Sequence, residues 1–221
     1  MGALVHLSAA DGHRFTAYRA DPVGAPKAGV VLLHEIYGVN THIRGLADAL
    51  ADEGYAVRVP ALFDRAEKGV ELDYSAAGAE HGCFLRDQIG WDAPLLDVAG
   101  AMETLKGFGR IAVVGESYGA TLAWRAAAKL PLAAAVCGSP GHLGEFLAEA
   151  PICPVLIHFG ARDPATPLDV RDRARTIAAV TAFDYDAGHA FTCPHREGFD
   201  SLATRTAETR TMDFLKRHLQ S

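Results

Sequence analysis

The sequence Ile111-Ala-Val-Val-Gly-Glu-Ser-Tyr-Gly-Ala120 decides the fold of this chain. A β-branched, apolar run leads into Gly-x-Ser-x-Gly, and an alanine-rich segment with helix-forming residues follows from Thr121 to Lys129. A strand, a sharp turn and a helix are the context in which this pattern exposes a serine hydroxyl. The turn needs nearly side-chain-free residues on both sides of the serine, and Gly115 and Gly119 provide them. The pattern therefore predicts Ser117 as a nucleophile, against the alternative of a glycine-rich turn with an incidental serine.

Strands and helices are predicted to alternate along most of the chain. Residues 3–20 contain the hairpin signal Asp11-Gly12 and predict two antiparallel edge strands. Apolar runs predict strands at 29–33, 55–59, 111–115, 132–137, 154–159 and 180–185. Helical periodicity predicts helices at 41–53, 92–106, 121–129, 169–179 and 201–219. This alternation predicts an α/β fold with a mostly parallel central sheet and helices on both faces.

The bulk properties favour one domain over residues 1–221. Residues 61–91 follow a central strand and predict an insertion with a helix near 75–88 that walls a binding cleft. The net charge of −6 argues against a nucleic-acid surface. No signal peptide and no run long enough to span a membrane is recognisable. The four cysteines are scattered without a C-x-x-C pair, which favours reduced thiols in a cytoplasm over disulfides.

Four polar residues stand where predicted parallel strands end, namely Glu35, Ser117, Asp163 and His189. Active sites in such sheets lie at the carboxyl ends of the strands. A serine needs a base to take its proton, and an imidazole that titrates near neutrality can be that base. A carboxylate can hold the imidazole in the required tautomer. The chain order serine, aspartate, histidine is the one expected for α/β-hydrolases.

Four motifs carry a resemblance to a known family: His34-Glu-Ile-Tyr-Gly-Val-Asn40 with Arg44, Gly115-Glu-Ser-Tyr-Gly-Ala120, Phe159-Gly-Ala-Arg-Asp163 and Ala187-Gly-His-Ala-Phe191. They occur in order and with compatible spacing over nearly the whole chain. The chain resembles the dienelactone hydrolases (carboxymethylenebutenolidase-like proteins) of the α/β-hydrolase fold. The Glu-Ile-aromatic-Gly block is the discriminating motif, because most other α/β-hydrolases have a different loop there.

The resemblance implies roles for single residues. Ser117 matches the nucleophile, Asp163 the acid and His189 the base. Glu35 matches a glutamate that contacts the nucleophile. The resemblance also implies that the backbone N–H groups of Ile36 and Tyr118 donate hydrogen bonds to the oxyanion that forms during the reaction.

The sequence departs from the family pattern in two respects. The best-known members use a cysteine nucleophile, whereas here the residue is serine. The lactonases hold the substrate carboxylate with two arginines, and at those places this chain has Thr192-Cys193-Pro194 and, near residues 79–81, Ala-Glu-His. Arg86 and Arg196 lie nearby but out of register, so they are candidates for substrate binding. These departures weaken specificity for a carboxylated dienelactone.

Several further residues allow two interpretations. The aromatic residues Tyr37, Phe84, Trp91 and Phe191 line the cleft or belong to the core. Glu35 acts in the site or is a structural acid paired with Arg44. The histidines His34, His158 and His195 are interpreted as polar fillers, and the cysteines Cys137 and Cys153 as core. A metal site is not predicted, because Cys193-x-His195 alone is a weak pattern.

The sequence thus predicts a cytoplasmic, cofactor-free hydrolase that cleaves a small lactone or ester through a Ser-His-Asp triad and an acyl-enzyme. Its expected state is a monomer or small homo-oligomer without a nucleic-acid or membrane partner. A general carboxylesterase or thioesterase is the alternative within the same class. A binding protein that kept the fold without activity is the alternative from a different class, and the intact set of three residues argues against it.

Overall fold

The computed structural model describes residues 2–220, which hold eight strands, seven α-helices and two short 3₁₀ helices. The chain divides into two compact units, Met1–Ile111 and Ala112–Ser221. Each unit contains four strands. Glu35 lies in the first unit, and Ser117, Asp163 and His189 lie in the second. The two units are described in turn.

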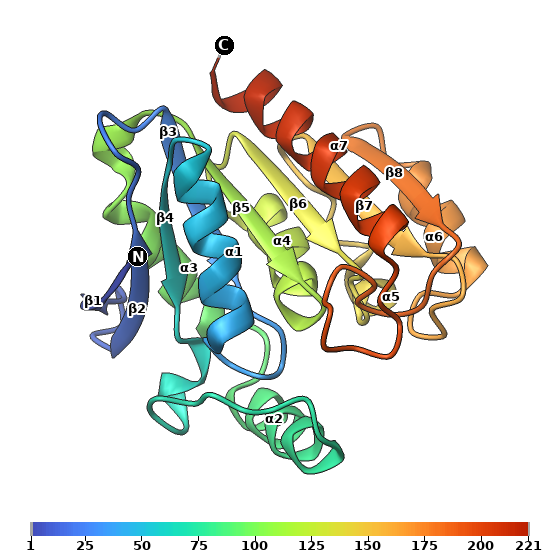
Figure 1. Ribbon diagram of the computed structural model, residues 1–221, viewed down its shortest axis with the longest axis horizontal. Coiled ribbons are helices and arrows are strands. Elements are labelled where there is room, and N and C mark those ends of the chain that lie inside the picture. The colour runs from blue at the N-terminus through green and yellow to red at the C-terminus, as the bar shows by residue number, and fades with distance from the viewer. Residues whose placement is uncertain (1, 221) are drawn as a thin grey trace. The chain divides into compact units, whose positions relative to one another are not determined.

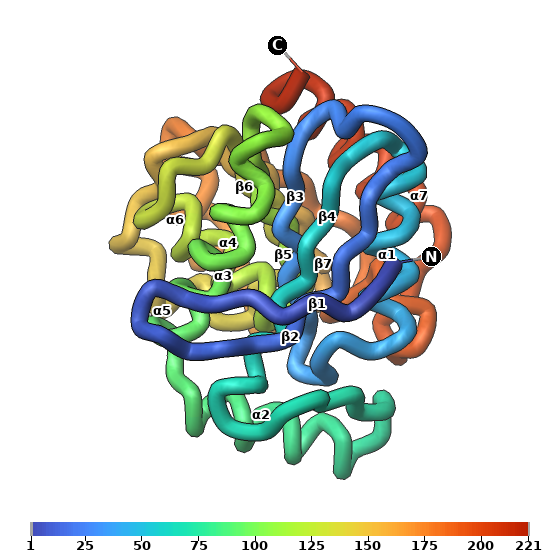
Figure 2. The backbone as a smooth tube through the Cα atoms, turned by 90° about the vertical axis from the view of Figure 1, so that its left-hand side faces the viewer, coloured from blue at the N-terminus to red at the C-terminus, as the bar shows by residue number. Residues whose placement is uncertain are grey.

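The first unit contains β1 (Ala3–Ser8), β2 (Arg14–Ala20), β3 (Ala28–Leu33) and β4 (Tyr55–Pro60). They lie in the order β1-β2-β4-β3, and the hairpin formed by β1 and β2 is seen in blue in Figure 2. The β1–β2 and β2–β4 pairs are antiparallel, whereas β3 and β4 are parallel. This confirms the predicted antiparallel N-terminal strands. Every residue of β3 and β4 is buried, as expected for strands covered on both faces.

Two helices cover opposite faces of these strands, α1 (Thr41–Asp52) and α3 (Ala93–Glu103) (Figures 1 and 2). Asn40 caps the start of helix α1, and its side-chain oxygen accepts a hydrogen bond from the Ile43 N–H at 3.2 Å. Its buried residues recur at helical spacing. The helix ends before Gly54, whose φ of +97° suits glycine at that place.

Residues 61–91 contain the 3₁₀ helix η1 (Leu62–Arg65) and helix α2 (Ala76–Ile89), which confirms the helix predicted near 75–88. Helix α2 packs closely on the loop after β3, since a Cβ added at Gly82 would lie 1.9 Å from the Ile36 carbonyl oxygen. Gly38 is equally constrained, with a φ of +74° and an added Cβ 2.0 Å from the Val70 carbonyl oxygen. Segment 61–91 therefore packs closely against the Glu-Ile-Tyr-Gly loop.

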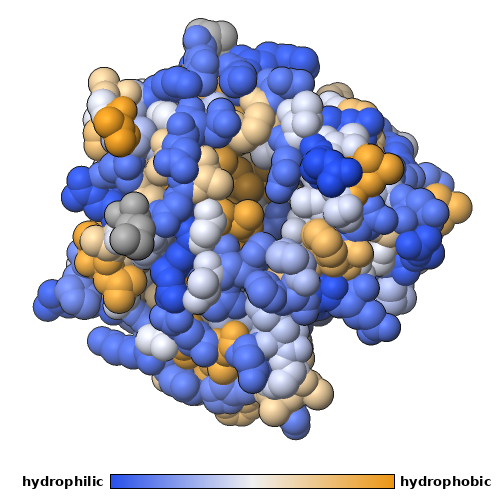
Figure 3. Space-filling view, viewed as in Figure 1, coloured by the Kyte–Doolittle hydropathy of each residue, from blue (hydrophilic) through white to orange (hydrophobic). Residues whose placement is uncertain are grey.

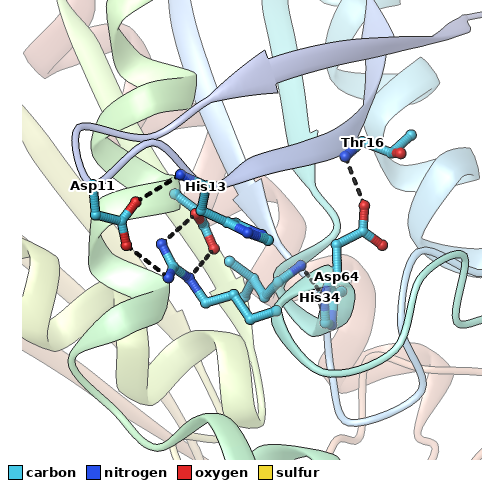
Figure 4. Close-up of polar contacts among 8 residues, drawn as sticks. Asp11, His13, Thr16, His34 and Asp64 are labelled. Carbon is cyan, nitrogen blue, oxygen red and sulfur yellow. Dashed lines mark hydrogen bonds and ion pairs between the residues drawn. The ribbon is translucent and has the colours of Figure 1, made fainter.

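A buried ion pair joins η1 to α3 (Figure 4). The Arg65 guanidinium donates two hydrogen bonds to Asp97, at 2.7 and 2.8 Å, and one to Asp11 in the β1–β2 turn at 2.9 Å. The Asp97 side chain has no exposed surface, and this burial raises the pKa of its carboxyl group above the usual range. Asp64 supports the same segment by accepting hydrogen bonds from the N–H groups of Thr16 and Gly69.

The second unit contains β5 from Ile111 to Glu116, β6 (Ala134–Gly138), β7 (Val155–Gly160) and β8 (Val180–Tyr185), all parallel and in chain order. Helix α7 (Ser201–Leu219) covers one face, and α4 (Tyr118–Lys129) and α6 (Leu168–Arg175) cover the other (Figures 1 and 2). A single turn, α5 (Leu143–Phe146), follows β6. Trp124 in α4 is fully buried and donates its indole N–H to the Phe146 carbonyl at 2.9 Å.

Some predicted boundaries were wrong. The helix predicted for 92–106 ends at Glu103 and continues as the 3₁₀ helix η2 (Lys106–Phe108). The helix predicted for 169–179 ends at Arg175, where the Thr176 hydroxyl donates to the Arg173 carbonyl. The apolar residues of the last helix also predict Leu202 as a core contact, but this residue is 67% exposed.

The face drawn in Figure 3 is mostly hydrophilic, with apolar residues in small groups. Among the described residues, no helix is both long and apolar enough to cross a membrane.

Candidate active site

The turn from β5 to α4 has the geometry that the glycine pattern predicts. Ser117 has φ 51° and ψ −107°, a backbone conformation that costs energy in a residue with a side chain. A Cβ added at Gly115 would lie 2.1 Å from the Gly119 carbonyl oxygen, so only glycine fits there. The Ser117 N–H donates to the Gly138 carbonyl at 2.8 Å, which holds the turn against β6. Ser117 is thereby fixed at the carboxyl end of β5 with its hydroxyl directed at a histidine.

Three side chains from separate strand ends form a hydrogen-bonded chain. The Ser117 Oγ lies 2.8 Å from His189 Nε2, and His189 Nδ1 lies 2.7 Å from Asp163 Oδ2. The Asp163 side chain is fully buried, and its other oxygen accepts the Ala165 N–H at 2.8 Å. Because an ionised carboxylate only accepts, the Nδ1 of His189 carries the proton. The Nε2 is then an acceptor for the serine hydroxyl.

The loop that carries His189 is packed tightly on its neighbours. A Cβ added at Gly160 would lie 2.3 Å from the Gly188 carbonyl oxygen. One added at Gly198 would lie 2.4 Å from the His189 carbonyl oxygen. These two contacts leave the loop between β8 and α7 little room to move past the end of β7.

Two further side chains hold this loop, and sequence reasoning did not identify them. The Ser139 hydroxyl accepts the Ala190 N–H at 3.1 Å, and the Thr192 hydroxyl donates to the Glu116 carboxylate at 3.0 Å. Ser139 follows β6 directly, and Glu116 ends β5. Their places at strand ends were visible in the sequence, but a serine and a glutamate there carry no recognisable pattern.

The first unit holds the Glu-Ile-Tyr-Gly loop. Glu35 is 1% exposed, and its carboxylate accepts a hydrogen bond from the Tyr74 hydroxyl at 3.2 Å. The Asn40 side chain donates to the same hydroxyl at 3.2 Å. Arg44 forms its ion pair with Glu71 at 2.5 Å, so the structural alternative in which Arg44 pairs with Glu35 is wrong. Tyr74 was not predicted to contact Glu35.

His34 connects the end of β3 to η1. Its Nδ1 lies 2.6 Å from the Glu35 carbonyl oxygen, and the Leu62 N–H lies 3.2 Å from its Nε2. Because a carbonyl can only accept and an N–H can only donate, Nδ1 is protonated and Nε2 is not. Complete burial lowers the pKa of His34 to about 4, so the imidazole is neutral at pH 7. Figure 4 shows His34 beside the Asp64 segment.

Comparison with known proteins decides the family. The sequence model of the dienelactone hydrolase family matches residues 15–219. The chain belongs to the dienelactone hydrolase family. A curated relative, the carboxymethylenebutenolidase of Pseudomonas putida, is 29% identical over 224 residues, which cover 96% of this chain and 94% of the relative. The resemblance and the hydrolase class predicted from the sequence are confirmed.

Solved structures share the fold. A dienelactone hydrolase-like promiscuous phosphotriesterase from metagenomic libraries has a TM-score of 0.78 at 22% identity, over 98% of each chain. An esterase of Pyrococcus furiosus has a TM-score of 0.72 at 20% identity, over 99% of this chain and 92% of the esterase. This family member therefore has the α/β-hydrolase fold, as predicted.

The candidate substrate residues of this hydrolase lie in different environments. Phe191 is fully buried against Tyr185, with ring centroids 4.8 Å apart, which fits the core alternative. Tyr37 is also buried and packs on the Tyr74 ring at 4.4 Å. Phe84 is 60% exposed.

The remaining candidates are polar or partly exposed. Trp91 and Arg196 are half-buried, and Arg86 forms an ion pair with Asp87 at 2.7 Å. Within residues 2–220, no cluster of three or more His, Cys, Asp or Glu side chains could hold a metal ion.

Proposed function

We propose that this chain hydrolyses a lactone or carboxylic ester through an acyl-enzyme on Ser117. The observation that carries the proposal is the hydrogen-bonded chain of Ser117, His189 and Asp163, with distances of 2.8 and 2.7 Å. A nucleophile, a base and a group that orients the base within hydrogen-bond reach are the parts that acyl transfer needs.

The first half-reaction forms the acyl-enzyme. The Ser117 Oγ attacks the carbonyl carbon while His189 Nε2 takes the hydroxyl proton, and the carbonyl electron pair moves onto oxygen. Asp163 stabilises the resulting imidazolium through Nδ1. The tetrahedral intermediate then collapses, the bond to the alcohol oxygen breaks, and His189 returns its proton to that oxygen.

The oxyanion needs hydrogen-bond donors where negative charge develops. Tyr118 occupies the first position of α4, and N–H groups at a helix N-terminus point out of the helix and favour negative charge. We assign the Tyr118 N–H as one donor on this ground. The Ile36 N–H is assigned as the second donor from the family resemblance.

The second half-reaction releases the acid. His189 Nε2 takes a proton from water, the hydroxide oxygen bonds to the acyl carbon, and Ser117 leaves and regains its proton from the imidazolium. One water is consumed for each ester, and a lactone yields a single hydroxy acid. A serine loses its proton only during attack, whereas a thiol can be ionised beforehand. Glu35 is therefore assigned a positioning role rather than that of a base that takes the proton of the nucleophile.

The proposed substrate is a small, uncharged ester or lactone. The second candidate function is that of a general carboxylesterase. The absence of arginine from Thr192-Cys193-Pro194 favours neutral substrates in both cases. The segment 61–91 is proposed to wall the substrate cleft.

The state of the cysteines leads us to propose that the protein acts in a reducing cytoplasm. All four are free thiols, and burial raises the pKa of Cys153 to about 11, which suppresses its thiolate. These thiols therefore suit a compartment in which disulfides do not form.

Turnover of p-nitrophenyl acetate and of a panel of lactones, esters and thioesters tests the proposal. Ser117→Ala should lower kcat by about 10³- to 10⁶-fold. Its melting temperature should hardly change, because a small side chain is lost. A phosphonylating reagent should add one group to the wild-type chain at Ser117 and none to the variant.

Ser8→Ala, an exposed serine in β1, is the matched control and should retain full activity and labelling at Ser117. Near-wild-type turnover by Ser117→Ala would show that the chemistry lies elsewhere. A wild-type chain that binds esters but turns over no member of the panel would support the non-catalytic alternative.

A further inference from the structure

The residues described by the structure include three non-glycine positions with positive φ: Ser117, Ser139 and Ala190, at 51°, 51° and 52°. Such conformations cost energy and persist only where the surroundings enforce them. The three are connected by hydrogen bonds. The Ser117 N–H donates to the Gly138 carbonyl, and the next residue, Ser139, accepts the Ala190 N–H on its hydroxyl. The strained positions thus link the nucleophile turn to the residue that follows His189.

Ser139 is itself held firmly. It is 1% exposed, and its N–H donates to the His158 carbonyl at 2.9 Å, which ties it to β7. The chain then turns past the imidazole, since a Cβ added at Gly141 would lie 3.4 Å from His189 Cε1. The segment that follows β6 therefore lies beside the ring of His189 and is hydrogen-bonded to the backbone next to it.

His189 lies in a loop without helix or strand, between β8 and α7. The position of its ring therefore depends on contacts made by the loop. One contact is the Ala190 N–H to Ser139, and a second is the Thr192 hydroxyl to the Glu116 carboxylate at 3.0 Å. Both contacts join the loop to a strand end beside the nucleophile turn.

We propose that Ser139 is a positioning residue that holds His189 in line with both Ser117 and Asp163. The inference rests on the proposed function. Removing the hydroxyl would leave the buried Ala190 N–H without its acceptor, a state that the loop can relieve by moving. Ala190 would then relax from its positive φ, and the adjacent imidazole would shift. A misplacement of about 1 Å in a reacting group is enough to slow catalysis by about 10²-fold.

Ser139→Ala and Ser139→Gly form the first test. Both remove the acceptor, but glycine also tolerates the positive φ of position 139. Both should lower kcat by about 10- to 100-fold with KM changed by less than about twofold, because positioning acts on the transition state. If glycine restores wild-type kcat while alanine does not, backbone strain rather than the hydrogen bond is the cause, and the proposal is overturned.

The far-downfield NMR resonance of the His189 Nδ1 proton, which is bonded to Asp163, provides a second test. If Ser139 only stabilised the fold, its substitution would leave this resonance unchanged. The resonance should broaden and exchange faster in both Ser139 variants, without any substrate present. A resonance identical to that of the wild type, together with unchanged kcat, would also overturn the proposal.

Two further variants sharpen the test. Thr192→Val removes the second contact, and the pair Ser139→Ala and Thr192→Val should be non-additive in kcat if both hold the same loop. Trp124→Phe removes the hydrogen bond from the Trp124 indole N–H to the Phe146 carbonyl, in the same unit, and should lower the melting temperature without slowing turnover. If it slows kcat as much as Ser139→Ala does, general destabilisation explains both effects and the proposal fails.

The failure of this inference is distinguishable from failure of the proposed function. If Ser117→Ala abolishes turnover and Ser139→Ala does not affect it, only the positioning role is wrong. If Ser117→Ala remains active, the proposed chemistry is wrong, and the resonance still reports whether Ser139 holds the imidazole.

Discussion

The Nδ1 atom of His189 lies 2.7 Å from Asp163 Oδ2, and the same carboxylate accepts the Ala165 N–H through its other oxygen. The carboxylate is therefore held in place before it orients the imidazole. The histidine, on a loop from a different strand, is oriented by a carboxylate whose two oxygens are both hydrogen-bonded.

This relationship predicts the effect of Asp163→Asn. An amide can donate to Nδ1, which moves the imidazole proton to Nε2 and blocks acceptance of the serine proton. We expect kcat to fall by about 10³- to 10⁴-fold with little change in KM. Steady-state kinetics on p-nitrophenyl acetate measures this, with Asp169→Asn on exposed α6 as the unaffected control. Retention of more than about a tenth of kcat would show that His189 does not depend on the carboxylate.

Acid should destabilise the protein partly through His34. Its pKa is about 4 in the folded state and 6.5 in the unfolded state. Between these values the unfolded chain binds more protons, so stability is fully present above pH 6.5 and falls as the pH is lowered towards 4. The loss from this group should reach about 3 kcal/mol, because each pKa unit is worth about 1.4 kcal/mol.

Urea unfolding of the wild type and His34→Gln at several pH values between 4 and 7 checks this prediction. Glutamine keeps a donor and an acceptor but does not titrate. The variant starts less stable, yet its stability should depend less steeply on pH. Equal slopes for both chains would mean that His34 protonates as readily in the folded state as in the unfolded one.

The ion pair of Arg65 with Asp97 should be essential to the first unit. Arg65→Met leaves the fully buried Asp97 carboxylate without its two donors, and removing one partner of a buried pair costs about 3–5 kcal/mol. Denaturant unfolding measures the loss. Asp11→Ala breaks the solvent-exposed contact of the same arginine and should have a much smaller effect. Comparable losses for the two variants would show that the exposed contact, not burial, makes this cluster important.

Neutral substrates should be preferred over carboxylated ones of the same size. Arg86 is paired with Asp87, and the Thr192 hydroxyl is bonded to the Glu116 carboxylate, so neither is positioned as a ready anion ligand. A charge-assisted hydrogen bond is worth about 1–3 kcal/mol, and we expect a preference of that size. The measurement compares kcat/KM for a carboxylated lactone and its methyl ester at two salt concentrations. A preference for the free acid that weakens with salt would show that a cation binds the carboxylate.

The elements nearest to the predicted site could be read from local patterns. The boundaries of β8 and α7 were predicted as found, at 180–185 and 201–219. The apolar run identifies β8, and the helical period identifies α7. The order of serine, aspartate and histidine at strand ends followed from the parallel topology. Local patterns did not predict helix α5, because its four residues are too few to show a helical period.

The sequence by itself determined the α/β class, the family and the residues that form the hydrogen-bonded chain, because these depend on periodicity and on motifs a few residues long. Only the tertiary structure decided what holds those residues in place. The contacts of Tyr74 with Glu35, Ser139 with Ala190 and Thr192 with Glu116 join positions 39, 51 and 76 residues apart. Such pairs have no local signature, because each side chain meets its partner only after the strands have brought their carboxyl ends together.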